Sequence, residues 1–138
     1  MSLKKKFYAG VLTTAMVATA AVPALANNHG DTYFNFSFGS GGGASYTDAR
    51  QKNDDSSGYV KIGGFYGNVL NAQVRIVGGN YAHVKAEEPN LSTSDVGRGI
   101  YLSNYVKESG LNSARLKVST GKSLDGGGVY GVWSPDSI

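Results

Sequence analysis

The sequence has no cysteine among its 138 residues. This absence excludes disulfide bonds, thiolate metal ligands and a lipid attached to a cysteine side chain. A folded domain of this chain must therefore take its stability from a packed core and from non-covalent polar contacts. The length that follows the N-terminal segment suits a single domain with one core.

Residues that carry out chemistry are also scarce. The only histidines are His29 and His83. Because His83 alternates with Tyr81 and Lys85, it is expected to face solvent, and no partner is designated that would make it a general base. A zinc site needs three or four ligands at suitable spacing, which the sequence does not provide. We therefore expect a protein that is not an enzyme and that uses no metal and no cofactor.

The N-terminal segment has the order of a secretory signal. Lys4, Lys5 and Lys6 precede an uncharged stretch at residues 7–22, and small residues follow up to Ala26. This basic, apolar, small-residue order is typical of a cleaved signal peptide, and the apolar stretch is shorter than the roughly 20 residues of a bilayer span. We expect a signal peptide at residues 1–26, a single secreted β domain at residues 27–138 and no membrane span after cleavage. An uncleaved membrane anchor is the alternative.

The domain that remains after removal of this segment has no excess of positive or negative charge. The chain has 13 basic and 10 acidic residues, but three of the lysines lie in the signal, so the remaining domain is formally neutral. Nucleic acids and anionic membranes are recognised by clustered Lys and Arg side chains. The charge balance therefore predicts no nucleic acid partner.

Short strands separated by glycine-rich turns are expected in the first half of the domain. Phe34, Phe36 and Phe38 alternate with polar residues, which is the period of a half-buried strand. Two hairpins are predicted from the turn residues. They pair residues 45–51 with 59–62, and residues 72–77 with 81–86 across Gly78-Gly79-Asn80.

The second half begins with a polar connection at residues 87–99. Residues 100–106 fit a strand, while residues 101–109 also fit a short helix, and both interpretations are open. Residues 114–119 alternate in polarity, and residues 129–133 form a last apolar strand. The whole pattern predicts an all-β fold, a small antiparallel β-sandwich of about 6–8 short strands, preceded by a signal-peptide helix.

Aromatic residues are abundant: outside the signal there are eight Tyr, four Phe and one Trp. Large aromatic side chains form much of a core, and Tyr is also common on recognition surfaces because it offers contact area and a hydroxyl at low entropic cost. We expect a core position for Phe34, Phe36, Phe38 and Trp133. Four tyrosines are candidate binding residues, with a core position as the alternative for each: Tyr46, Tyr66, Tyr101 and Tyr105.

The C-terminal sequence Trp133-Ser134-Pro135-Asp136 has a structural interpretation. Proline ends a strand because it lacks the backbone donor. Asp136 can accept hydrogen bonds from nearby backbone or pair with an arginine, for which Arg50, Arg75 and Arg115 are candidates. A structural latch is favoured over a binding motif.

Three runs of sequence, at residues 46–61, 104–116 and 131–137, resemble a family of small secreted proteins of Gram-positive bacteria, domain of unknown function 2712. The ending Trp-Ser-Pro-Asp-Ser at residues 133–137 is the most specific part of the resemblance. Size, export and β-richness are also similar to lactococcin-type β-sandwich bacteriocins, which is a likeness of architecture alone. The resemblance implies secretion and a bacterial origin, and no mechanism.

These observations favour a secreted, non-enzymatic protein that is bacteriocin-like or recognises the cell envelope. Its partner would be an envelope component or a protein receptor. The alternative is an extracellular matrix or surface-structural protein that self-associates through exposed strand edges. A third hypothesis is a small hydrolase that uses carboxylates such as Asp48, Asp54 or Asp125.

Overall fold

The computed structural model describes residues 28–137, so the predicted signal peptide lies outside the described residues. Within that range nine β-strands and one short 3-10 helix form. Their bounds are β1 Thr32–Phe38, β2 Gly43–Tyr46, β3 Arg50–Gln51, β4 Gly58–Gly67, β5 Asn71–Gly78, β6 Asn90–Ser92, η2 Thr93–Asp95, β7 Gly99–Leu102, β8 Ser113–Thr120 and β9 Gly127–Ser134.

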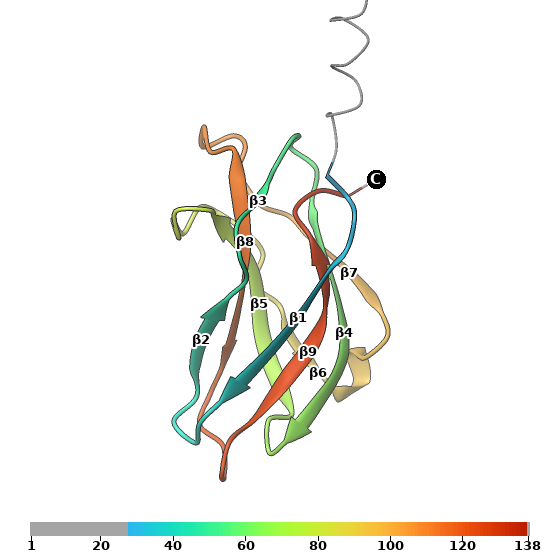
Figure 1. Cartoon of the computed structure of the whole chain (residues 1–138), viewed down its shortest axis with the longest axis vertical. Helices are drawn as coiled ribbons and strands as arrows, with labels where there is room; N and C mark the ends of the chain where they lie inside the picture. The colour runs from blue at the N-terminus through green and yellow to red at the C-terminus, as the bar shows by residue number, and fades with distance from the viewer. Residues whose placement is uncertain (1–27, 138) are drawn as a thin grey trace, which may run out of the picture.

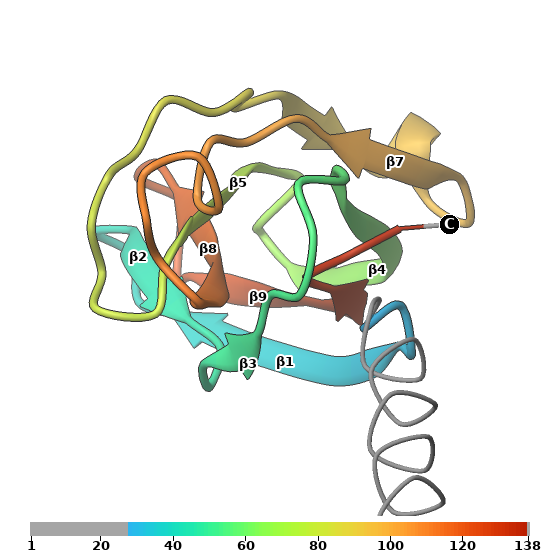
Figure 2. The ribbon, with the colours of Figure 1, turned by 90° about the horizontal axis from the view of Figure 1, so that it is seen from above.

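The strands form two sheets that pack face to face (Figures 1 and 2). The first sheet has the order β1-β9-β4-β7, and the second has the order β2-β8-β5-β6, with β3 also paired to β8. Every pairing between these strands is antiparallel. The predicted all-β antiparallel sandwich is therefore confirmed, with slightly more strands than expected because the two-residue β3 and the three-residue β6 add to the count.

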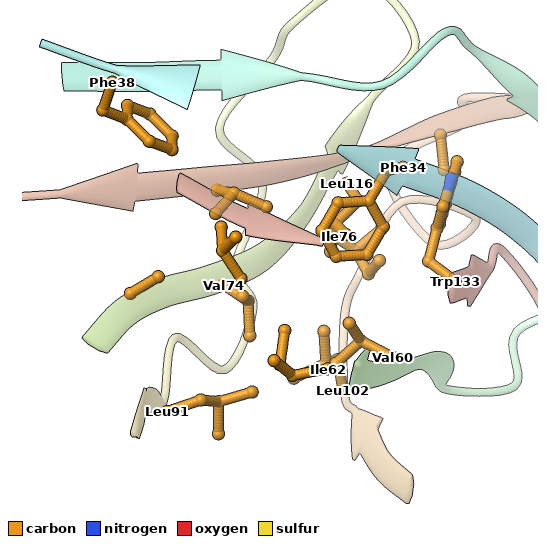
Figure 3. Close-up of a cluster of buried hydrophobic side chains, with 14 of the residues drawn as sticks. Phe34, Phe38, Val60, Ile62, Val74, Ile76, Leu91, Leu102, Leu116 and Trp133 are labelled. Atoms are coloured by element: carbon orange, nitrogen blue, oxygen red, sulfur yellow. The ribbon is translucent and has the colours of Figure 1, made fainter. Parts of the chain in front are cut away.

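The core lies between the sheets and follows from the period-2 patterns of the strands. Ala114, Leu116 and Val118 are fully buried on β8, between partly exposed neighbours. Phe34, Phe38 and Trp133 join this core, as Figure 3 shows, while Phe36 is only partly buried and packs against its edge. The predicted core positions of Phe34, Phe38 and Trp133 are confirmed, whereas Phe36 lies at the edge of the core.

The first predicted hairpin is wrong. Residues 45–51 form β2 and β3, which pair with β8 in the second sheet, whereas β4 pairs with β9 and β7 in the first. The expected polar loop between them instead crosses from one sheet to the other. It begins with Lys52, whose side chain is fully buried. A buried lysine with its own partners fixes this crossing, and the sequence pattern gave no sign of it.

The second predicted hairpin is also wrong, although its turn forms. The Tyr81 backbone N–H donates to the Gly78 carbonyl at 2.9 Å, and the Gly78 N–H donates to Ala82 at 2.9 Å. Beyond this turn no strand follows: β5 pairs with β8 over residues 73–78 and with β6 over residues 71–73. The chain instead runs as a loop whose only sheet-like contact is a bridge between Ala86 and Asn104.

The predicted connection at residues 87–99 contains β6 and η2, and the strand expected at residues 100–106 ends early, at Leu102. The alternative helix at residues 101–109 does not form. Asn104 ends the strand, because its side-chain amide donates to the Leu102 carbonyl and its side-chain oxygen accepts from the Val106 N–H. A series of turns follows and places Val106 in the core.

We expect Leu116→Ala to lower the free energy of unfolding by about 2 to 5 kcal/mol, because it leaves a cavity between the sheets. Denaturant unfolding monitored by circular dichroism checks this value. Leu124→Ala is the matched control: Leu124 is 77% exposed, so its loss should change stability by less than about 0.5 kcal/mol. Equal effects of the two substitutions would contradict the assigned core.

Candidate functional site

The outer face of the first sheet is lined with tyrosine. Residues directly opposite each other on paired strands share a face. Tyr59 lies opposite both Tyr101 and Ser134, Tyr33 lies opposite Val132, and Tyr66 lies opposite Gly128. The alternation along each strand then places five tyrosines on the same side of the sheet, away from the core. We call this surface the tyrosine face: Tyr33, Tyr59, Tyr66, Tyr101 and Tyr130.

A β-bulge in β4 makes this arrangement possible. The register between β4 and β9 shifts by one residue, since Ile62 pairs with Gly131 but Gly64 pairs with Tyr130. The extra residue is Gly63, and it reverses the alternation that follows. As a result Phe65 packs against the core and Tyr66 points outward.

Glycines lie beneath three of the tyrosine rings. A Cβ atom added to Gly128 would lie 2.2 Å from the Tyr66 ring, one on Gly64 would lie 2.6 Å from the Tyr130 hydroxyl, and one on Gly99 would lie 2.7 Å from Tyr59. Any side chain at these three positions would require the tyrosine ring to move. The rings therefore lie close against the sheet and form a low, broad aromatic surface.

Tyr66 is held in place by its hydroxyl group. The side chain crosses β9 and reaches β1, where its hydroxyl donates to Asn35 Oδ1 at 3.0 Å and is within 2.9 Å of Ser37 Oγ. A ring that is already fixed loses little side-chain entropy when a ligand stacks on it. Part of the tyrosine face is thus preorganised.

A cavity of about 250 Å³ lies at one end of the tyrosine face. The Tyr59 and Tyr101 rings in its wall have centroids 5.5 Å apart. Burial, followed by the negative charge of Asp31 and the neighbouring Tyr101, raises the pKa of Tyr59 above its usual value, so its hydroxyl stays protonated. We call this cavity the end pocket, and its lining residues are His29, Asp31, Tyr59, Tyr101, Ser134, Asp136 and Ser137.

The chemistry of the end pocket suits a polar, uncharged ligand with apolar faces. Aromatic rings offer stacking surfaces, and the tyrosine hydroxyls both donate and accept hydrogen bonds. Asp31 adds a carboxylate that accepts from hydroxyl or amide donors. This combination fits sugar rings, whose faces carry C–H groups and whose edges carry hydroxyls.

The floor of the end pocket is fixed by a buried ion pair. Lys52 Nζ donates to Asp136 Oδ1 at 3.0 Å, to the Pro135 carbonyl at 2.9 Å and to the Ser56 carbonyl at 2.7 Å. Asp136 Oδ2 accepts from two backbone N–H groups, those of Asn28 at 2.9 Å and Asn53 at 3.0 Å. Both side chains are fully buried, and each proton of the ammonium group has an acceptor. We call these contacts the latch.

Of the two partners considered for Asp136, backbone N–H groups and an arginine, the structure shows the backbone N–H groups of Asn28 and Asn53. The cation is Lys52, and the arginines bind backbone carbonyls elsewhere. Arg50 donates to Gly30 at 2.7 Å and lies 5.7 Å from the Trp133 ring centroid. Burial lowers the pKa of Arg50, against the opposing effect of Asp136 and Asp31.

Arg115 and Arg75 lie on the outer side of the second sheet. Arg115 donates to the carbonyls of Thr47 at 2.9 Å and Gly79 at 2.8 Å, and its guanidinium lies 4.3 Å from the Tyr81 ring centroid. Arg75 forms an ion pair with Glu88 at 3.0 Å. Arg115 and Arg50 therefore contact backbone carbonyls and aromatic rings rather than Asp136.

The four candidate tyrosines do not form one surface. Tyr66 and Tyr101 belong to the tyrosine face. Tyr46 lies on β2 and packs edge-on against Tyr81, with centroids 5.0 Å apart, and Tyr105 lies in the turns after β7, 5.1 Å from the Lys85 ammonium. Sequence reasoning missed Tyr33, Tyr59 and Tyr130, although the alternation of Tyr33 with Phe34 was a usable signal.

Other chemical groups are dispersed in the part of the chain that the structure describes. Asp48, Asp54 and Asp125 lie in three different loops, and His83 is exposed, as predicted, near Lys117. Burial and the charges of Lys117 and Arg75 lower the pKa of His83, against an opposing effect of Glu88. Over residues 28–137, no three His, Asp or Glu side chains gather as a metal site would require. No helix in this range is long and apolar enough to cross a membrane.

We expect Asp136→Ala to lower the free energy of unfolding by about 3 to 5 kcal/mol, because it leaves the Lys52 ammonium buried without its counter-charge. Denaturant unfolding measures the change. Asp55→Ala is the control, because it removes an exposed carboxylate from the loop between β3 and β4. Its expected effect on the free energy of unfolding is below about 0.5 kcal/mol. A similar, small effect of both substitutions would show that the latch is not needed for stability.

Comparison with known proteins places the chain in a family and offers no annotated relative. Searches of curated proteins and of solved structures found no match. A family profile described as protein of unknown function (DUF2712) matches residues 22–137, which include both sheets, the tyrosine face and the latch. The chain therefore belongs to the DUF2712 family.

Proposed function

We propose that this protein is secreted and, without catalysing a reaction, recognises glycan in the cell envelope of Gram-positive bacteria through the tyrosine face and the end pocket. The observation that carries the proposal is the set of aromatic rings on one sheet face, which ends in a pocket with hydroxyl and carboxylate groups. The signal-like sequence before Ala26 supports export. The likeness to β-sandwich bacteriocins suggests that binding could serve to inhibit neighbouring cells.

The charge of the domain agrees with a neutral ligand. Residues 28–137 carry equal numbers of basic and acidic side chains, so binding to a polyanion would gain little from counterion release. At the start of β4, two side chains point outward on the side of the tyrosine face. They are Tyr59 and Lys61, of which only Lys61 is basic. Stacking and hydrogen bonds supply the affinity in this proposal.

We expect purified protein lacking residues 1–26 to co-sediment with isolated Gram-positive cell walls. Tyr101→Ala and Tyr59→Ala should each weaken binding by about tenfold or more, because each removes one wall of the end pocket. Tyr105→Ala is the matched control, since Tyr105 is also exposed but lies off the tyrosine face. Binding that is absent, or equally weakened by all three substitutions, would refute the proposed site.

Self-association is a second candidate function, and the observation that favours it is the free edge of β1. This strand is the outermost of the first sheet and carries no charged residue and no proline over Thr32–Phe38. Charged residues and prolines are the common protection of exposed edges.

If self-association is the function, sedimentation velocity should show a concentration-dependent dimer or larger assembly. Asn35→Lys, which places a charge at the centre of β1, should shift the distribution to monomer, while Asp55→Ala should not. A monomer over the whole concentration range would exclude this candidate.

A further inference from the structure

A second pocket opens on the side of the sandwich, between the edges of the two sheets. β1 ends the first sheet and β2 ends the second, and these edges lie on the same side of the molecule (Figures 1 and 2). The cavity between them has a volume of about 250 Å³. We call it the side pocket, and the residues that matter for its chemistry are Phe34, Phe36, Tyr46, Thr47, Arg50 and Trp133.

Two contacts lie at the ends of β1. At one end the turn from Gly39 to Gly42 joins β1 to β2, with the Gly42 N–H donating to the Gly39 carbonyl at 3.0 Å. At the other end Arg50, on β3, donates to the Gly30 carbonyl at 2.7 Å. The β1 residues that line the side pocket, within positions 32–36, lie between these two contacts in the sequence.

Trp133 lines this pocket with an unused hydrogen-bond donor. Its side chain is fully buried beside Phe34, as Figure 3 shows, and its indole N–H has no hydrogen-bond partner among the described residues. Such a group is costly to bury and gains from any acceptor that reaches it. Two polar neighbours are already engaged, since Thr47 Oγ1 accepts from the Leu116 N–H and Arg50 donates to backbone and to Asn28, while Thr32 and Asp48 also line the pocket.

The edge of β1 next to the pocket is unusually open for pairing. β1 pairs with β9 in continuous register from Thr32 to Phe38, without a bulge, and its other edge pairs with none of the described strands. A strand edge with no charge, proline or bulge is a template for an added strand. In that mode of recognition the main chain provides affinity and side-chain pockets provide specificity.

We propose that the side pocket and the free edge of β1 together bind an extended, uncharged segment of a partner protein. The segment pairs with β1 and inserts one aromatic side chain carrying a hydroxyl, tyrosine, whose oxygen accepts from the Trp133 N–H. The side pocket touches the tyrosine face only at Tyr33, lies away from the end pocket and does not depend on the proposed glycan ligand.

The single tryptophan provides a direct test. Trp133 is the only Trp in the chain, so a ¹⁵N-correlated NMR spectrum contains one indole N–H peak. The probe is the peptide acetyl-Thr-Val-Tyr-Val-Thr-amide. We expect a saturable downfield shift of the indole peak together with shifts of the β1 amides. The same peptide with Ala in place of Tyr should bind at least about tenfold more weakly.

Two variants separate the pocket from the strand edge. Thr32 lies opposite Trp133 and lines the side pocket, so Thr32→Phe should fill it and weaken the tyrosine peptide at least about tenfold. Leu124→Ala, an exposed position that lines neither pocket, is the control and should leave binding unchanged. Trp133→Phe removes the indole donor, so this variant should bind the tyrosine peptide no more tightly than the same peptide with Phe in place of Tyr. Because the variant has no indole peak, binding is measured from the shifts of the β1 backbone amides.

Three results would overturn the proposal. The first is a spectrum in which neither the indole peak nor the β1 amides respond to the peptide. The second is a response confined to the tyrosine face. The third is a protein that forms a dimer through β1 and excludes the peptide. Loss of cell-wall binding in Tyr101→Ala with peptide binding intact would show that the two sites are independent.

Discussion

The buried contact between Lys52 and Asp136 holds the two sheets together at one end of the molecule. Lys52 comes directly after β3, which belongs to the second sheet. Asp136 comes shortly after β9, which belongs to the first sheet. Many small domains make this type of cross-connection with a disulfide, which a chain without cysteine cannot form. Burying two charges is tolerated here because the carboxylate and the ammonium are both fully hydrogen-bonded.

The same contact shapes the surface proposed for recognition. Asp136 accepts from the Asn28 N–H and thereby fixes the segment that leads to Asp31, a wall of the end pocket. The Ser137 N–H donates to Ser56 Oγ at 3.0 Å, just before β4 begins with Gly58 and Tyr59. The end pocket is thus built from both ends of the described chain, and its shape follows from a buried polar network rather than from a loop.

Local patterns in the sequence identified the strands better than their partners. The alternation in β1, β8 and β9 was sufficient, because each inward position reports burial directly. Pairing depends on distant residues: the turn at Gly78 forms, yet β5 pairs with β8 and β6. Lys52 resembled a solvated loop residue, since nothing near it in sequence reveals a carboxylate that arrives from residue 136. The tyrosine face was only partly predicted for the same reason, as it needs the register of four strands and a bulge at Gly63.

The glycines beneath the tyrosine rings link the evolution of positions far apart in the chain. The Tyr66 ring occupies the space that a side chain at Gly128 would need. The Tyr130 ring likewise occupies the space next to Gly63 and Gly64. A larger residue at either glycine site would lift the ring from the sheet, so such a change would be tolerated only when the tyrosine becomes smaller. Within the family, each aromatic ring and its glycine should therefore be inherited as a unit, and the flatness of this face is a property of pairs rather than of single residues.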